Sequence, residues 1–127
     1  MTIVVAYADT EPGHAALRAA VQEAVLRRQD IVVTPPVSDF HPTEQDITAF
    51  LAGSEEDLGT TGVQLSVKTS QLHDPADAVI QVAQEVGASA ICLGLRHRTA
   101  IGKLLLGSTA QRILLDAPCM IIAVKPS

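Results

Sequence analysis

Residues 94 to 109 combine glycines, hydroxyls and basic side chains in an order that suits the binding of an anion. Gly94 ends an apolar run, and Gly107, Ser108 and Thr109 open a helical pattern. Glycine lets a backbone approach an oxyanion closely, and the first N–H groups of a helix have no partner within it. The helix dipole favours negative charge at that end, and the two hydroxyls can donate as well. The segment therefore predicts a phosphate-binding site.

The side chains of this segment each allow two interpretations. Arg96 and its neighbour Arg98 either contact phosphate, which the arginine fork fits well, or are solvated loop charges. His97 is either a surface side chain that narrows the pocket or an imidazole that contacts phosphate and responds to pH. Residues 107–109 could also be an ordinary helix start with a hydroxyl cap.

The composition indicates one domain, residues 1–127, with an aliphatic core. Of the 127 residues, 47% are hydrophobic and 2% aromatic, which is usual for parallel sheets that helices cover. The net charge of −5 argues against a general nucleic-acid binder. No apolar run reaches the roughly 18 residues that span a bilayer, and no basic stretch precedes the first apolar run. We therefore expect a cytoplasmic protein that contacts neither membrane nor nucleic acid.

Apolar runs alternate with helical patterns along the chain. Strands are predicted at 3–8, 31–34, 63–70, 90–93 and 119–124, and helices at 12–28, 43–58, 75–86 and 108–116. Thr43, with Asp46 three residues later, and Asp74 are expected to cap two of the helices. This alternation implies an α/β fold with one doubly wound, parallel five-stranded sheet of order 3-2-1-4-5 and helices on both faces. Ligands of such sheets bind at the carboxyl ends of the strands where the order reverses, here beside the glycine segment.

Four stretches of the chain resemble signatures of the universal stress protein family. They are Asp-Pro-Ala-Asp-Ala-Val-Ile from residue 74, Gly-Ala-Ser-Ala-Ile-Cys-Leu-Gly from 87, Leu-Leu-Leu-Gly-Ser-Thr-Ala from 104 and Asp-Ala-Pro-Cys-Met-Ile-Ile-Ala-Val from 116. The resemblance covers the whole domain and implies a Rossmann-like fold and a role in the stress response. The family's ATP-binding branch carries Gly-x-x-Gly, nine residues, then Gly-Ser or Gly-Thr. Gly94, His97 and Gly107-Ser108 keep that spacing, with histidine at the second glycine.

The resemblance implies an altered nucleotide site. Together with the residue pattern it places the nucleotide at Ala8, Asp9, Gly94, Arg96, His97, Gly107, Ser108 and Thr109. The family's ATP binders usually end the first strand with Asp-Gly-Ser, whose aspartate helps to hold the nucleotide and a metal, and the matching residues here are Ala8-Asp9-Thr10. Asp9 is then a turn or helix-cap residue or, as the minor alternative, faces a metal. Pro36 stands where the family often has a valine that touches adenine. The resemblance implies ATP or AMP as ligand, and magnesium only weakly.

Two functions follow from these residues. The first is a small regulatory protein that binds an adenine nucleotide and hydrolyses ATP slowly at most. The second is a nucleotide-independent, homodimeric stress or interaction module with a degenerate phosphate loop. An efficient enzyme is disfavoured because the sequence has no nucleophile elbow and no P-loop motif. His14, His41 and His73 lack the spacing of metal ligands.

The last predicted strand would lie at an edge of the sheet in this strand order. It carries six consecutive apolar residues from Cys119 to Val124, and exposed apolar edges invite pairing with another chain. We expect a homodimer in which this strand pairs antiparallel with its own copy. The resemblance implies the same, because universal stress proteins commonly dimerise through this strand. The alternative is an edge that a terminal or loop segment covers.

Overall fold

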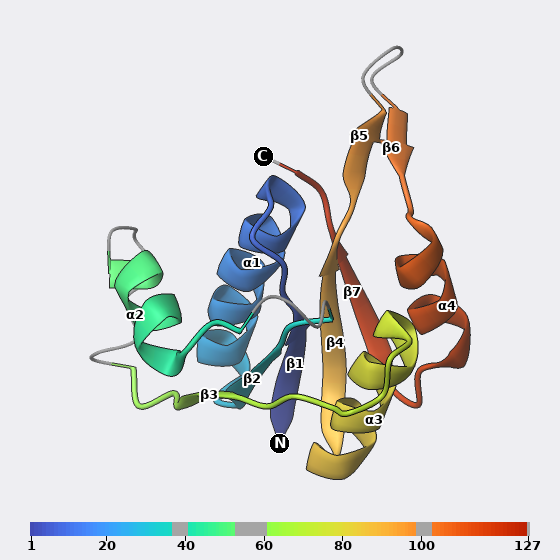
Figure 1. The fold of residues 1–127 in the computed structure, drawn as a ribbon. Coiled ribbons are helices and arrows are strands. Elements are labelled where there is room, and N and C mark those ends of the chain that lie inside the picture. The colour runs from blue at the N-terminus through green and yellow to red at the C-terminus, as the bar shows by residue number, and fades with distance from the viewer. Residues whose placement is uncertain (37–40, 53–60, 99–102, 127) are drawn as a thin grey trace.

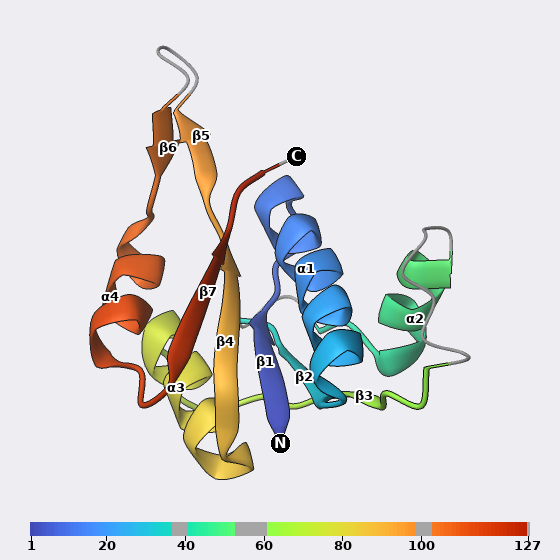
Figure 2. The same cartoon turned by 180° about the vertical axis from the view of Figure 1, so that it is seen from behind.

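The computed structural model describes residues 1–36, 41–52, 61–98 and 103–126. Its strands are β1 (Thr2–Ala6), β2 (Asp30–Thr34), β3 (Leu65–Val67), β4 (Ala88–Gly94), β5 (Arg96–Arg98), β6 (Lys103–Leu105) and β7 (Met120–Val124). Its helices are α1 (Glu11–Arg27), α2 (Glu44–Ala52), α3 (Pro75–Val86) and α4 (Ser108–Asp116). Helices α1 and α2 lie on one side of the sheet, and α3 and α4 on the other (Figures 1 and 2).

Five parallel strands form the main sheet in the order β3-β2-β1-β4-β7. This confirms the predicted order 3-2-1-4-5. The central strand β1 pairs on both sides, so that Val5 is in register with Val33 of β2 and with Cys92 of β4. The strand order reverses between β1 and β4, and their carboxyl ends therefore flank the crevice where sheets of this kind bind ligands.

Alternate side chains of each strand pack into two separate cores, because successive residues point to opposite faces of a sheet. Ile3 and Val5 of β1 are buried with Leu17 beneath α1 and α2. Val4, between them, is buried with Val79 of α3 on the other face. Aliphatic side chains thus cover both faces of the sheet. This packing holds in place the strand ends that form the site.

A two-stranded antiparallel hairpin, β5–β6, stands where the sequence predicted an irregular glycine loop. Arg96 pairs with Leu105, and Arg98 pairs with Lys103. The hairpin extends beyond the carboxyl ends of the parallel strands (Figure 1). Its strands are three residues each, and such short basic and leucine runs carry no alternating pattern that would have predicted them.

The predicted helix bounds are confirmed for α3 and α4 and differ elsewhere. Helix α2 is described over Glu44–Ala52, whereas the prediction ran to residue 58, and residues 53–60 lie outside the described part. Strand β3 covers Leu65–Val67 and is shorter than the predicted 63–70. An edge strand with one polar face has few contacts that could extend it.

The helix caps confirm one expectation and correct another. Thr43 and Asp46 form a capping box, in which the Thr43 N–H donates to Asp46 at 2.9 Å and the Asp46 N–H donates to the Thr43 hydroxyl at 3.1 Å. Asp74 occupies the cap position of α3 but makes no side-chain cap hydrogen bond. Its carboxylate instead accepts from Arg112 of α4, because an ion pair across the two helices competes for the same oxygen atoms.

Strand β7 lies at one edge of the sheet, with β4 as its neighbour on the inner side. In the described part of the chain no strand pairs with its outer side. Met120 at its start is 46% exposed, so the edge is partly apolar.

None of the described helices is long and apolar enough to cross a membrane. The cytoplasmic location stays a prediction.

Candidate functional site

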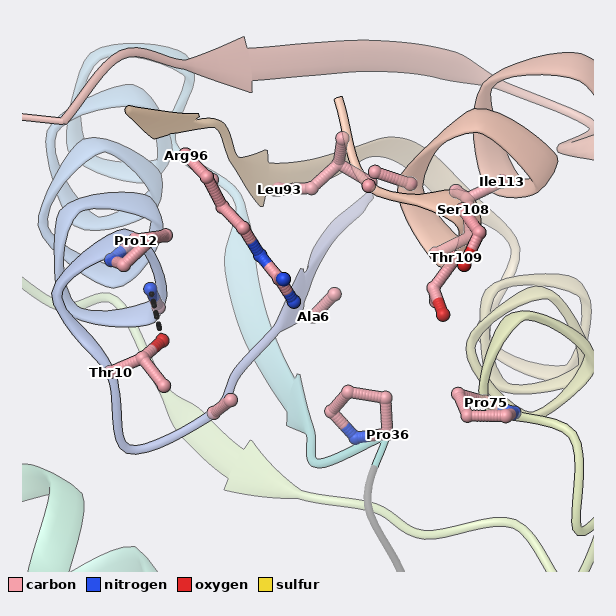
Figure 3. Close-up of a pocket in the computed structure, with 15 residues that line it drawn as sticks. Ala6, Thr10, Pro12, Pro36, Pro75, Leu93, Arg96, Ser108, Thr109 and Ile113 are labelled. Carbon is pink, nitrogen blue, oxygen red and sulfur yellow. Dashed lines mark hydrogen bonds between the residues drawn. The ribbon is translucent and has the colours of Figure 1, made fainter. Parts of the chain in front are cut away.

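A pocket opens at the carboxyl ends of β1 and β4, where the strand order predicted a ligand crevice (Figure 3). Its volume is about 250 Å³, and its walls come from β1, α1, β4, β5 and the starts of α3 and α4. We call it the Arg96 pocket. Six of the eight predicted nucleotide-binding residues line it: Ala8, Gly94, Arg96, Gly107, Ser108 and Thr109.

Gly94 serves close packing at the edge of the Arg96 pocket. A Cβ atom placed on Gly94 would lie 2.1 Å from the Pro12 carbonyl oxygen, and one on Gly13 would lie 2.0 Å from the Ala8 carbonyl oxygen. Both contacts are with backbone, so a side chain at either position would push α1 away from the strands. The missing side chain of Gly94 therefore makes room for α1, whereas the sequence interpretation gave that room to an oxyanion.

Gly107 has the open surroundings that Gly94 lacks. The nearest atoms to a Cβ placed there are Cζ and Nε of Arg96, both at 3.9 Å. Gly107 is the N-cap of α4, and this helix start has no side-chain cap hydrogen bond. The Ser108 and Thr109 side chains lie on the pocket wall (Figure 3). The N-cap residue is thus a glycine without a side chain, which corrects the alternative in which a serine or threonine hydroxyl caps this helix.

Arg96 brings a second positive group to the start of α4. Its side chain extends from β5 into the pocket, toward the side of β1 (Figure 3). No carboxylate in the described part of the chain forms an ion pair with Arg96. Since a helix N-terminus carries partial positive charge, it repels a guanidinium beside it. An anion between Arg96 and Gly107 would be attracted by both groups.

The remainder of the Arg96 pocket is largely apolar. Leu93 of β4 and Ile113 of α4 are buried in the core beneath α3 and α4. Pro36 after β2 and Pro75 at the start of α3 lie across the pocket from Arg96 (Figure 3). A pocket with an apolar wall and a few convergent polar groups is the usual form of a small-molecule site.

Ala8 and Asp9 lie in different pockets although they are neighbours in the chain. Ala8 lines the Arg96 pocket. Asp9 lines a second pocket, on the other side of the loop after β1, where its carboxylate lies 3.0 Å from Nε2 of His14. Adjacent residues in extended backbone point to opposite sides, which explains the separation. The structure therefore does not bring Asp9 to the predicted site.

His97 is placed only through its backbone, which pairs with Leu104 in the β5–β6 hairpin. Its side chain lies outside the described part, so both interpretations of the imidazole remain predictions.

Thr34 was not singled out by any sequence pattern. Its hydroxyl is buried, with no hydrogen-bond partner in the part that the structure describes, and it is in register with Ala6 of the pocket wall. A polar residue at the end of an apolar strand run was the available signal.

The second pocket, which we call the His14 pocket, has a volume of about 340 Å³. The His14 ring stacks on Phe50 of α2 with 4.7 Å between ring centroids. The Arg18 guanidinium lies over the same Phe50 ring, 5.0 Å from its centroid. Tyr7 is buried at its base, and burial, followed by the nearby Asp9 charge, raises the pKa of its hydroxyl. These groups hold α2 against α1.

Residues 1–125 match the model of the universal stress protein family. A universal stress protein of Mycolicibacterium smegmatis is 32% identical, with 98% of this chain and 97% of the relative covered. A universal stress protein of Thermus aquaticus is 30% identical, with 98% of each chain covered. The chain belongs to the universal stress protein family.

Solved structures share the fold over nearly the whole chain. The universal stress protein of Archaeoglobus fulgidus has a TM-score of 0.71 at 24% identity and covers 98% of this chain and 97% of its own. A universal stress protein from the same organism, solved with dAMP, has a TM-score of 0.62 at 20% identity, covering 98% and 96%. A universal stress protein solved in complex with cAMP has a TM-score of 0.61 at 18% identity, covering 99% of this chain and 98% of its own.

Proposed function

We propose that this chain binds an adenine nucleotide in the Arg96 pocket, with a phosphate between the Arg96 guanidinium and the start of α4. The observation that carries the proposal is the convergence of these two positive groups, since guanidinium atoms lie 3.9 Å from the Cβ position of Gly107. A phosphate there accepts charge-assisted hydrogen bonds from Arg96 and meets the unpaired N–H groups of the helix start. The hydroxyls of Ser108 and Thr109 are available as further donors.

The apolar side of the pocket suits the base and the ribose. Pro36 and Pro75 lie across the pocket from Arg96 (Figure 3), so a flat ring can rest against them while the phosphate faces Arg96. Relatives of this fold have been solved with dAMP and with cAMP, which supports adenine as the base. Pro36 then contacts the ring at the position where the family often has valine.

The chemistry of the lining favours a regulatory ligand over a substrate. No acid, histidine or cysteine is among the lining residues that the structure describes, so the hydroxyls of Thr10, Ser108 and Thr109 have no general base in that lining to activate them as nucleophiles. We therefore expect ATP or AMP to act through occupancy of the pocket in a stress-response role, with ATP hydrolysis slow at most.

Isothermal titration with ATP, ADP and AMP tests the proposal directly. Wild-type protein should bind at least one of the three, and Gly107→Val should abolish binding because the branched side chain fills the space beside Arg96. Arg27→Ala removes a positive charge that pairs with Glu23 on α1, away from the pocket, and should bind as the wild type does. No heat and no thermal shift with millimolar ATP, ADP or AMP would refute nucleotide binding.

The alternative function is a homodimeric interaction module, and the exposed edge at β7 favours it. The outer side of this strand has no partner strand in the described part of the chain, and open edges pair readily with copies of themselves. Ile122→Pro removes a backbone donor from β7 and should disrupt the dimer. Light scattering at micromolar concentration should give twice the chain mass of 13.3 kDa for wild type. A wild-type monomer would refute the dimer.

A further inference from the structure

The Arg96 pocket raises the question of which form of a nucleotide phosphate it accepts, the magnesium complex or the free anion. The answer rests on the proposed function, since it concerns the same site. The family resemblance implies a metal next to the nucleotide, and whether magnesium fits here depends on the oxygen ligands that the residues present supply.

The donors of the pocket do not suit magnesium. Protein sites for Mg²⁺ usually supply one or two carboxylates beside the phosphate oxygens. The oxygen-bearing side chains among the described lining residues are the hydroxyls of Thr10, Ser108 and Thr109. The Thr10 hydroxyl already accepts from the Gly13 N–H at 3.2 Å. In the described part of the chain no group of three or more histidines, cysteines or acids could hold a metal ion.

Three acidic residues adjoin lining residues in sequence, Asp9, Glu11 and Asp74, and none of them is among the described residues that line the pocket. Glu11 is exposed in the first turn of α1. Asp9, directly after Ala8, lies in the His14 pocket with its carboxylate 3.0 Å from His14. Asp74, directly before Pro75, accepts from Arg112. Neither residue is among those that line the Arg96 pocket. Moving Asp9 into the pocket would break its hydrogen bond with His14, and moving Asp74 would break its ion pair with Arg112.

The charge in the pocket has the same sign as a metal ion. Among the described lining residues Arg96 carries the charge, and the start of α4 adds partial positive charge beside it. A phosphate already neutralised by Mg²⁺ would offer less negative charge to both groups, and the ion would be repelled by them. Guanidinium binds phosphate through two parallel hydrogen bonds and needs no metal.

We propose that this pocket binds its nucleotide as the metal-free anion, with Arg96 at the place that a metal ion would take. Magnesium therefore competes with the protein for a polyphosphate and weakens binding. The effect should be large for ATP, which chelates Mg²⁺ strongly, and slight for AMP, which has a single phosphate.

Titration of the wild type with ATP and with AMP, each in EDTA and in excess MgCl₂ at equal ionic strength, tests the proposal. We expect the affinity for ATP to fall at least tenfold with magnesium and the affinity for AMP to stay within twofold. An ATP affinity that is unchanged or higher with magnesium would overturn the proposal while leaving nucleotide binding intact. No binding of either nucleotide in either buffer would overturn the proposed function as well.

Substitutions at Arg96 and Ala8, each with a control variant, test which residues determine nucleotide binding and its response to magnesium. Arg96→Ala should lose at least tenfold in affinity in EDTA, while Arg27→Ala should lose none. Ala8→Asp adds a carboxylate to the pocket and should weaken ATP binding in EDTA but make magnesium favourable, whereas Ala8→Asn, of similar size without charge, should keep the wild-type response. An Ala8→Asp protein that folds and still loses affinity with magnesium would overturn the role given to the missing carboxylate.

Discussion

The two pockets beside the loop after β1 differ in how their charged groups are used. In the His14 pocket Asp9 lies 3.0 Å from His14, and the carboxylate of Asp46 accepts from a backbone N–H at 2.9 Å. In the Arg96 pocket the guanidinium has no ion-pair partner in the described part of the chain. In the His14 pocket, therefore, the carboxylates of Asp9 and Asp46 already have partners within the protein.

A cavity by itself therefore does not mark a binding site. Charged groups paired within the protein stabilise the fold, and those without an internal partner are available to a ligand. Substitutions in the His14 pocket should therefore change stability, and those in the Arg96 pocket should change affinity.

The largest effect is expected at Gly94, which borders the Arg96 pocket but serves packing. Gly94→Ala brings a Cβ within 2.1 Å of the Pro12 carbonyl oxygen and should lower the free energy of unfolding by about 3 kcal/mol, the upper end for overpacking. Gly107→Ala should cost less than about 1 kcal/mol, since it only makes a poorer helix cap. Urea unfolding followed by circular dichroism measures both. Equal losses would show that the two glycines have the same role.

Phe50 tests the structural role of the His14 pocket. Phe50→Ala removes the ring that contacts His14 and Arg18. It should lower the free energy of unfolding by about 2 kcal/mol, less than the 3–5 kcal/mol of a fully buried phenylalanine, because the ring is half-buried. The affinity for AMP should not change. A loss of affinity without a loss of stability would reverse the roles given to the two pockets.

Ser108 tests the Arg96 pocket by a smaller change. Ser108→Ala removes one neutral hydrogen bond and should weaken nucleotide binding by about 0.5–1.5 kcal/mol, roughly two- to twelvefold in Kd. Its unfolding midpoint should stay close to the wild-type value, because Ser108 is exposed and the N-cap of α4 is Gly107. Asp9→Asn provides the matched control, and titration should show unchanged affinity for it. A greater loss for Asp9→Asn than for Ser108→Ala would return Asp9 to the binding site.

The strand order of the sheet could be predicted from the sequence, because the alternation of local strand and helix patterns determines it. Apolar runs such as 90–93, separated by helical patterns, leave few topologies that respect right-handed crossovers. Helices α3 and α4 were predicted with their observed bounds because Pro75 and Gly107 mark their starts clearly. The β5–β6 hairpin was missed, since its pairing depends on contacts between short runs without alternation.

The sequence predicted most of the site residues that line the pocket, but it did not predict the role of each residue. The position of Gly94 in the pocket followed from the spacing, yet the atoms that fill the place of its side chain come from Pro12, far away in sequence. The Asp9 carboxylate is held in its direction by a hydrogen bond with His14, five residues later. Neither contact has a sequence signature, because both arise from how α1 docks on the strands.

The smallest effect should come from Asp46, whose carboxylate lines the His14 pocket but caps α2. Hydrogen bonds from the backbone and then the side chain of Thr43 hold the pKa of Asp46 below its usual value of 3.8. Because the unfolded chain takes up this proton first, the stability that Asp46 adds is full above pH 4 and is lost as the pH falls through the lower folded pKa. Wild type should therefore have a higher urea midpoint than Asp46→Asn at pH 7, and the gap should narrow at pH 3. Glu44→Gln removes a charge from the same helix turn without touching the capping box. At pH 7 its urea midpoint should differ less from that of the wild type than the midpoint of Asp46→Asn does. A gap for Asp46→Asn that is the same at both pH values would show that the capping carboxylate does not stabilise α2 through its charge.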